Sequence, residues 1–234
     1  MSTSGSWQDR DMDAESDGSI PGMRRWRGRP PADRIAARRE QLIEAAIELM
    51  ATIGAAETSM RGVCRQAGLT ERYFYESFPN LDALFTTALE TVVNDARDQL
   101  LAALATAPAD PEKLFLHAIS AFTDYIVEDR RRGRIMFVES QTTRVLGDRG
   151  YELIEQFTTP IALTIGLGTD GQPVPDPSDI ALNSHAIFGA MAYMYRPWLD
   201  GAIDMSRERF DNHATRVLRN IADARSSESS TTAG

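Results

Sequence analysis

The sequence predicts an all-α protein, in which an N-terminal three-helix domain containing a helix-turn-helix is joined to a larger helical domain. Apolar residues recur at spacings of three and four through most of the 234-residue chain, and no stretch keeps the alternation of a strand. Proline, glycine and capping residues divide this pattern into segments of helical length. We therefore expect helices alone.

Changes in composition divide the chain into four parts. The first 22 residues and the serine- and threonine-rich C-terminal end are low in apolar content, so we expect both ends to be disordered. The predicted parts are a tail at 1–31 that carries a basic arm at 24–31, a helix-turn-helix domain at 32–80, a larger helical domain at 81–226 and a second tail at 227–234.

Bulk composition argues against several classes of protein. No apolar run approaches the length of a membrane span, and the polar N-terminus lacks the apolar core of a signal peptide, so we expect a cytoplasmic protein without a membrane partner. The three histidines are far apart and have no zinc-like spacing with Cys64, so we predict no metal and no cofactor. Cys64 itself should be a packed small residue rather than a redox sensor.

Capping residues mark three helices before residue 80. Asp33, Ser59, Thr70 and Asn80 are candidate N-caps, and Gly54 suits the left-handed residue after the first helix. These helices should span 33–53, 59–66 and 71–78.

Longer helices should fill the rest of the chain. Pro160 and Pro197 fall inside two of them, and each should kink or split its helix. The predicted ranges are 81–105, 110–130, 133–146, 149–167, 178–200 and 205–224.

Positive charge is concentrated beside the first helix, although the whole chain carries a net charge of -9. Residues 24–40 hold seven arginines against two acidic residues, and RRWRGRPP at 24–31 holds four of these arginines. A basic segment in an acidic protein suggests a local polyanion site. A solvated basic linker would have the same composition, so charge alone leaves both interpretations open.

A tight turn at Ala67-Gly68-Leu69 joins the second and third predicted helices in a helix-turn-helix pattern. Phe74 and Phe78 are four residues apart and should point into the core. The other sides then expose an arginine and two tyrosines, which can bind guanine edges, phosphates and thymine methyls in a major groove. Periodicity also allows a helical hairpin whose tyrosines bind nothing. The exposed residues should be Glu71, Arg72, Tyr73, Tyr75 and Glu76.

Residues 38–85 resemble the DNA-binding domain of the TetR family of bacterial transcriptional regulators. Linked motifs carry the resemblance: a helix ending at Gly54, then Ser59-Met60-Arg61, Ala67-Gly68-Leu69 and an aromatic helix closing in Phe78-Pro79. The resemblance implies that 81–226 is a ligand-binding and dimerisation domain. It also implies DNA contacts from Ser59 and Arg61 to the backbone and a base edge, and from Thr70, Arg72, Tyr73 and Tyr75 along the recognition helix.

One position departs from the family pattern, because Leu81 stands where the family commonly has a lysine that contacts phosphate. The missing attraction would have to come from elsewhere. Many family members carry a basic extension before the first helix, where this chain has its arm. The R-G-R-P core of the arm resembles an AT-hook, so Arg27 and Arg29 are candidates to enter an adjacent minor groove, with general attraction to phosphates as the alternative.

The resemblance further implies a cavity for an apolar or amphipathic small-molecule effector in the second domain. Aromatic residues could line it, with polar groups orienting the ligand, although aromatic residues of a core look the same in sequence. His185 is also typical of a packed core or interface residue. The candidates are Phe122, Tyr125, Phe137, Gln141, His185 and Phe188.

The last two helices should form an isologous homodimer. Small residues would allow the helices to approach closely, and an apolar stripe follows the last helix. A dimer presents two recognition helices, which implies a palindromic operator with half-sites about 34–36 Å apart. The expected interface residues are Ala186, Gly189, Ala190, Ala192, Phe210, Ala214, Val217, Leu218 and Ile221.

We therefore predict a ligand-responsive, sequence-specific DNA-binding regulator that is not an enzyme, most simply a repressor released by its effector. The sequence does not separate repression from activation. One alternative is an architectural DNA-binding protein, against which the large second domain argues. Another is a helical enzyme on an apolar substrate, but the chain has no Ser-His-Asp or Cys-His arrangement, P-loop or dinucleotide fingerprint.

Overall fold

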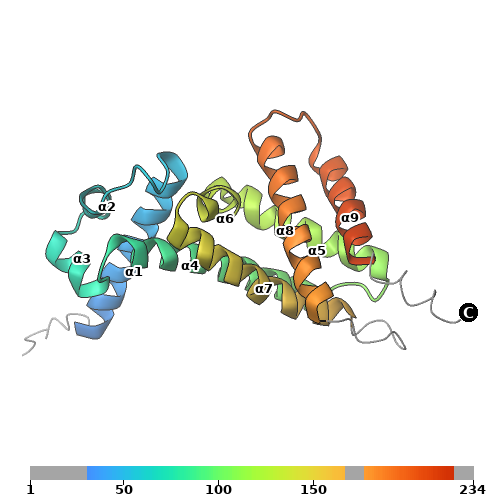
Figure 1. The fold of residues 1–234 in the computed structure, drawn as a ribbon, viewed down its shortest axis with the longest axis horizontal. Coiled ribbons are helices and arrows are strands. Elements are labelled where there is room, and N and C mark those ends of the chain that lie inside the picture. Colours follow the sequence, from blue (N-terminus) through green and yellow to red (C-terminus); the bar gives the residue numbers. More distant parts are fainter. Residues whose placement is uncertain (1–30, 167–176, 224–234) are drawn as a thin grey trace, which may run out of the picture.

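The computed structural model describes residues 31–166 and 177–223, and every regular element in these ranges is helical, which confirms the predicted all-α class. The helices of the N-terminal domain gather at one end of an elongated molecule, and the last two helices stand at the other (Figure 1). The elements are α1 (Pro31–Thr52), α2 (Met60–Ala67), α3 (Glu71–Ser77), α4 (Leu81–Ala105), α5 (Pro111–Glu128), α6 (Arg130–Phe137), the 3-10 helix η1 (Glu139–Gln141), α7 (Arg144–Gly166), α8 (Pro177–Leu199) and α9 (Arg207–Asp223).

Local hydrogen bonds set the limits of the short N-terminal helices. Ser59 Oγ accepts a hydrogen bond from the Gly62 amide at 3.1 Å, and Asn80 Oδ1 accepts one from the Ala83 amide at 2.8 Å, so both predicted caps are confirmed. Gly68 ends α2 with a φ of 67°, in the left-handed region that favours glycine. The chain can therefore turn sharply into α3.

Of the other two predicted caps, Asp33 is wrong, whereas Thr70 has the predicted position without the capping bond. Asp33 lies in the first turn of α1, which begins earlier, at Pro31. Proline suits a first helical position because the amide there needs no partner within the helix. Thr70 stands at the cap position of α3, but its side chain makes no capping hydrogen bond.

The segment between α5 and α7 differs most from the prediction of one helix at 133–146. A new helix begins before this range, because the Asp129 carboxylate caps α6 by accepting a hydrogen bond from the Arg131 amide at 3.0 Å. The chain then turns through η1 before α7. Gly133 lies inside α6 and ends no helix, since a Cβ there would meet side chains of α5 and α8 at 3.1 Å. This glycine serves close helix packing.

The two helix prolines do not split their helices. α7 continues past Pro160 to Gly166, and α8 continues past Pro197 to Leu199. Pro197 lies in the last turn of α8, where the loss of one backbone hydrogen bond interrupts little of the helix. Neither helix is therefore divided at its proline, and the alternative of a kink stays a prediction.

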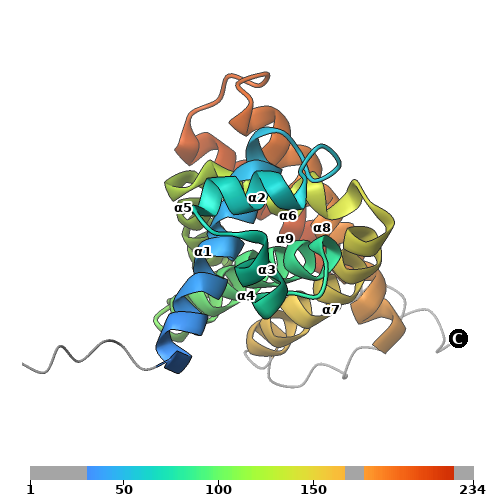
Figure 2. The ribbon, with the colours of Figure 1, turned by 90° about the vertical axis from the view of Figure 1, so that its left-hand side faces the viewer.

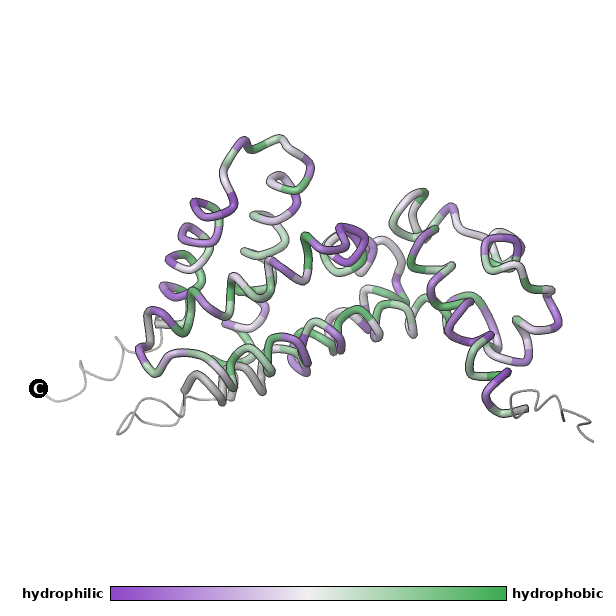
Figure 3. Tube along the Cα trace, turned by 180° about the vertical axis from the view of Figure 1, so that it is seen from behind, coloured by the Kyte–Doolittle hydropathy of each residue, from purple (hydrophilic) through white to green (hydrophobic). Residues whose placement is uncertain are grey.

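α4 is the central helix of the molecule. It packs on α1 near its start and against α5 and α7 along its length, while α8 packs on α7 and α9. Figure 3 shows hydrophobic residues along much of the α4 and α7 pair. The stripe that α4 buries runs without a break from the N-terminal domain into the second domain, and consists of Leu84, Phe85, Ala88, Leu89, Val92, Val93, Ala96, Leu100 and Leu104.

Candidate nucleic-acid interface

The recognition-helix candidate α3 is anchored by aromatic residues and presents polar residues outward. Phe74 is fully buried and Phe78 is 3% exposed, which confirms that both face the core. Arg72 and Tyr75 are exposed on α3, and Arg61 is exposed on the neighbouring α2. In Figure 2 the end of the molecule formed by α1, α2 and α3 faces the viewer. The predicted arginines and one of the tyrosines therefore share an accessible end of the molecule.

Tyr73 departs from its predicted exposure. Its side chain is half-buried, and the Arg38 guanidinium of α1 lies 4.1 Å from the centre of its ring. The neighbouring Arg39 stacks on the Phe78 ring in the same way, at 4.3 Å. Two consecutive arginines of α1 thus hold the aromatic side of α3 through cation–π contacts. In the sequence both arginines are only part of a basic segment, because no local pattern distinguishes a stacked arginine from a solvated one.

Ser59 and Thr70 are exposed at the starts of α2 and α3. Ser59 Oγ is an acceptor in its cap, so its hydroxyl proton remains available. The Thr70 side chain is not engaged in a cap. Both hydroxyls can therefore donate a hydrogen bond to a phosphate oxygen.

The exposed arginines form ion pairs with carboxylates of α3. Arg61 Nε lies 3.0 Å from Glu71 Oε1, and Arg72 Nε lies 3.0 Å from Glu76 Oε1. The second oxygen of Glu76 binds Arg38 Nη1 at 3.2 Å. From the sequence these glutamates were expected only to be exposed on the recognition helix, and their pairing with three arginines became visible only in the fold.

The remaining DNA-binding candidates lie at or beyond the edges of this surface. Arg27 and Arg29 fall outside the described residues, so their insertion into a minor groove stays a prediction. Leu81 is half-buried and packs against the core at the start of α4, where the Asn80 cap already binds the Ala83 amide. A leucine here contributes to packing instead of binding phosphate.

A buried carboxylate joins the two domains. Glu139 has only 2% of its side chain exposed, and its Oε2 accepts a hydrogen bond from the Ala55 amide at 2.9 Å. Its Oε1 lies 3.1 Å from Arg134 Nη2. Gly54, which has a φ of 91°, lies against the same carboxylate. The turn after α1 is therefore held by a residue of the second domain.

A partly buried charged cluster connects the same two parts of the molecule. The Arg131 guanidinium of α6 binds Glu44 at 2.7 Å and Glu48 at 2.9 Å on α1. It also binds Asp129 at 2.7 Å, and this side-chain hydrogen bond lowers the pKa of the Asp129 carboxyl. α6 consequently contacts the N-terminal domain through charged side chains from two successive turns of α1.

An apolar cavity of about 40 Å³ lies inside the second domain. Phe122, Phe137 and Phe188 line it, so the structure brings three of the six candidates together. Ser140 and Thr158 are the polar side chains in the lining, and the rest is apolar. The other lining residues are Leu89, Val93, Met136, Gly150, Leu153, Ile154, Phe157, Ile187 and Met191.

The three polar candidates do not line this cavity. Tyr125 is buried elsewhere and donates a hydrogen bond to the Val92 carbonyl at 2.8 Å, and burial raises the pKa of its phenol. Gln141 is exposed. His185 is half-buried, with its Nδ1 2.8 Å from the Ala181 carbonyl and its ring against Tyr151. The resemblance implied polar groups beside a cavity, but the sequence does not tell which side of each helix faces that cavity.

The outer faces of α8 and α9 differ from the predicted interface. Phe210, Ala214 and Leu218 are buried within the protomer, so the apolar stripe of α9 serves its own core. α8 exposes Leu182 and Tyr193, with side chains 71% and 87% exposed. Exposed Ala186 and half-buried Gly189, whose missing Cβ would meet nothing, lie between them. α8 therefore supplies the accessible apolar face.

Three further expectations concern the state of Cys64, a metal site and a membrane span. Cys64 is buried and burial raises the pKa of its thiol, which agrees with a packed small residue. Within the described ranges, no three His, Cys, Asp or Glu residues are grouped so as to hold a metal ion. In the same ranges, no helix is long and apolar enough to cross a membrane.

Comparison with known proteins agrees with these features. Residues 42–88 match the model of a family described as bacterial regulatory proteins, tetR family. No curated protein matches the chain.

Solved structures resemble the chain over most of its length. A proposed tetR-family transcription regulator from Shewanella sp. PV-4 is 16% identical, covers 78% of this chain and 96% of its own, and has a TM-score of 0.66. The fatty acid degradation regulator FadR from Bacillus halodurans is 14% identical, with 79% and 94% covered and a TM-score of 0.63.

A third structure is the transcriptional regulator FadR from Bacillus subtilis in complex with stearoyl-CoA. It is 16% identical, with 76% of this chain and 96% of that chain covered, and its TM-score is 0.64. At such identities these structures show a shared fold, whereas the family match shows the relationship of the N-terminal domain. The family match therefore covers the helix-turn-helix end of the chain, and the chain as a whole shares the fold of these regulators.

Proposed function

We propose that the protein is a transcriptional regulator that binds a specific DNA sequence through α2 and α3. The observation that carries this proposal is the exposure of Arg61, Arg72 and Tyr75 on a helix-turn-helix whose opposite side is fixed by buried Phe74 and Phe78. Arginine can bind guanine through two hydrogen bonds, and tyrosine can reach phosphate or a thymine methyl. A rigid support keeps these groups at the positions that base reading requires.

The operator would be palindromic and bound by a dimer. The exposed face of α8, which runs from Leu182 past Ala186 and Gly189 to Tyr193, supports an isologous contact between two copies. Small residues at its centre allow close helix approach. A two-fold axis through this face would present two α3 helices, so half-sites would repeat about 34–36 Å apart.

An effector with a long apolar part would release the DNA, which makes the regulator a repressor. The apolar lining of the cavity supports such a ligand, and the FadR structure from Bacillus subtilis holds an acyl-CoA ester in a related fold. A cavity of about 40 Å³ is far smaller than an acyl chain, so α4, α7 and α8 must separate to admit one. Leu89 of the lining is one helical turn from Phe85 on α4, so the separation would reach the DNA-binding domain.

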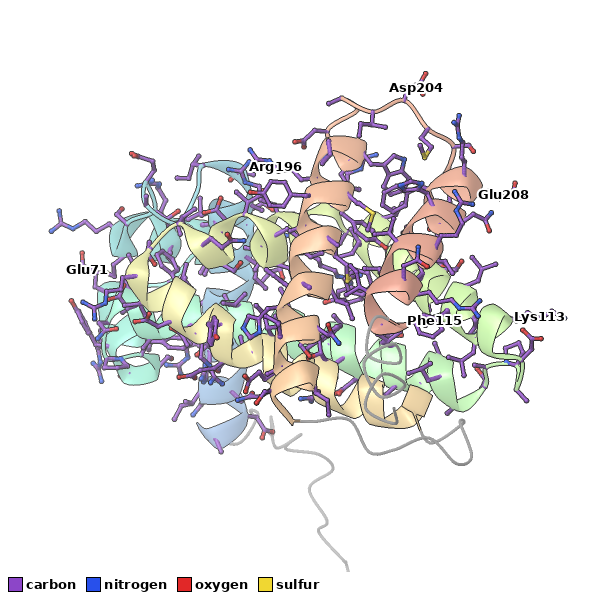
Figure 4. All side chains as sticks on the ribbon, turned by 45° about the vertical axis from the view of Figure 1, so that its right-hand side comes forward. Glu71, Lys113, Phe115, Arg196, Asp204 and Glu208 are labelled. Carbon is purple, nitrogen blue, oxygen red and sulfur yellow. The ribbon has the colours of Figure 1, made fainter. Side chains whose placement is uncertain are left out.

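Selection from a random duplex library followed by a competition assay tests the DNA-binding proposal. We expect a palindrome that remains bound in the presence of random competitor DNA. Arg72→Ala should weaken operator binding by about 10- to 100-fold because a base contact is lost. Arg209→Ala, which changes an exposed arginine near the start of α9, is the matched control and should bind normally; the neighbouring Glu208 lies at the opposite end of the molecule from Glu71 of α3 (Figure 4). Binding that any competitor removes would instead indicate an architectural protein.

The effector proposal has a separate test. Acyl-CoA esters and free fatty acids of increasing chain length are added to the operator complex, and release is followed by fluorescence anisotropy. Longer chains should release the DNA at lower concentration. Ile154→Phe, which fills the cavity, should leave operator affinity unchanged and raise the concentration needed for release. Release that is independent of Ile154→Phe would place the ligand elsewhere.

A further inference from the structure

Two carboxylates lie among the groups that would read DNA. Glu71 and Glu76 belong to α3 itself, and each is within 3.0 Å of an arginine that the proposed function assigns to DNA. Side-chain exposure is 82% for Arg61 and 85% for Arg72, so both arginines could extend into solvent. They are folded onto carboxylates instead.

We propose that Glu71 and Glu76 restrain non-specific DNA binding by holding Arg61 and Arg72 in internal ion pairs. This inference rests on the proposed DNA-binding function and assigns these two residues as determinants of its specificity. The paired arginines cannot neutralise backbone phosphates, and the carboxylates repel phosphates that approach them.

The energetics of exposed ion pairs make the restraint reversible. Such pairs are weak because water screens them, so a better acceptor can open them. A guanine edge offers an arginine two aligned acceptors, while the freed carboxylate can accept a hydrogen bond from the amino group of a neighbouring cytosine. A phosphate offers the arginine an acceptor but leaves the carboxylate beside a like charge. Only a matching sequence therefore compensates both partners.

Glu76 is held in place by a second contact besides its ion pair with Arg72. Its second oxygen binds Arg38 at 3.2 Å, and Arg38 in turn stacks on the Tyr73 ring at 4.1 Å. This chain of contacts from α1 holds the carboxylate on the outer side of α3. Glu76 therefore stays beside Arg72 rather than swinging away from the DNA.

The restraint predicts a gain of non-specific binding when the carboxylates are neutralised. The double variant Glu71→Gln with Glu76→Gln is titrated with a random-sequence duplex at several potassium chloride concentrations. We expect its affinity to rise by at least about tenfold, and the slope of log K against log salt to steepen by about 0.9 for each arginine released. The operator should gain less, so the ratio of operator to random affinity should fall.

A matched control separates this effect from net charge. Glu155→Gln with Glu208→Gln makes the same charge change on exposed residues of α7 and α9. Figure 4 shows Glu208 at the opposite end of the molecule from Glu71. An equal gain in the control, or no gain in the α3 variant, overturns the proposal. Loss of operator binding without a change in random binding also overturns it, because the carboxylates would then only read bases.

A further variant tests whether the arginines carry the effect. Adding Arg61→Ala and Arg72→Ala to the α3 glutamine variant should return the salt slope to the wild-type value or below it. A persistent gain without these arginines would mean that the carboxylates only repel phosphate, which overturns the ion-pair mechanism. If the wild-type protein binds no duplex even at low salt, the proposed function itself has failed, which is a different result from an unchanged double variant.

Discussion

At the scale of single residues, Glu139 joins the domains most directly, because it is buried and binds the backbone of the turn after α1. Its carboxylate accepts the Ala55 amide at 2.9 Å and pairs with Arg134, which is half exposed and can reach water. The buried Ala55 amide cannot reach water, so it depends on the Glu139 carboxylate. The contact therefore fixes the position of the DNA-binding domain more than it contributes through charge.

Replacing the Glu139 carboxylate should lower the free energy of unfolding. The loss should depend on whether the new side chain can still accept the hydrogen bond from the Ala55 amide. Glu139→Ala leaves the Ala55 amide without a partner and should reduce the free energy of unfolding by about 2–3 kcal/mol. Glu139→Gln keeps an acceptor and should lose less than half of that. Urea denaturation followed by circular dichroism measures both. The exposed control Glu155→Ala should be nearly neutral, and equal losses for Ala and Gln would show that charge, not the amide bond, matters.

At the scale of elements, α6 exists as a separate helix because Asp129 caps it and pairs with Arg131. The hydrogen bonds from Arg131 lower the pKa of Asp129, so the charged carboxylate is stabilised in the folded state. A depressed folded pKa contributes stability that is present above the ordinary pKa of about 3.9 and is lost as pH falls through the folded value. The cap at the domain junction should therefore weaken in acid.

Asp129→Asn tests this dependence because it keeps a capping oxygen and removes the charge. At pH 7 we expect the variant to be less stable by about 1 kcal/mol. The difference from wild type should begin to shrink as pH falls below about 4, where the unfolded carboxyl takes up a proton, and should vanish only below the lowered folded pKa, where both proteins carry a neutral residue. Chemical denaturation across this pH range measures the difference. Asp204→Asn, in the exposed α8–α9 connection, should show no such change, and a constant deficit at all pH values would contradict the assignment.

The arm before α1 is an element whose contribution can be measured by deletion. Removing residues 1–30 should make the salt dependence of DNA binding shallower, by about 0.9 in slope for each arginine that contacts phosphate. Removing only residues 1–22 deletes the acidic tail and keeps RRWRGRPP, so it should leave the slope unchanged. A slope that is equal in both truncations would identify the arm as a linker.

The helices also show how much of the fold could be predicted from the sequence. α4 was predicted with its observed bounds because a cap, a continuous apolar stripe and a proline beyond its end all agree. α6 and η1 were missed, because the glycine at 133 looks like a breaker when the helix it packs against is unknown. Periodicity placed Phe74 and Phe78 in the core. The ion pairs that Arg38 and Arg61 form with glutamates of α3 depend on contacts between helices, which no local sequence pattern indicates.

At the scale of the whole molecule, two DNA-binding domains must be held at a fixed separation, and the exposed face of α8 is the proposed contact. Tyr193→Glu introduces a charge at its most exposed apolar residue and should shift the protein to monomer in analytical ultracentrifugation. Operator affinity should then fall by at least tenfold, since a single half-site offers about half the contacts.

The control for dimerisation is an equivalent charge on another face. Val127→Glu changes an exposed apolar residue of α5 and should leave both the oligomeric state and operator affinity unchanged. A Tyr193→Glu protein that remains dimeric would require a different interface. The apolar stripe of α9 was predicted to belong to this contact, because a stripe alone does not tell which neighbour covers it.

The small size of the cavity has a kinetic consequence. If a cavity of about 40 Å³ must open before an apolar chain can enter, the opening motion limits how fast the effector is captured. The observed association rate should then level off at high effector concentration instead of rising in proportion. An apparent affinity measured at equilibrium would be weaker than the intrinsic one by the fraction of molecules that are open. A substitution that props the cavity open would therefore sensitise the regulator to its effector without touching the ligand.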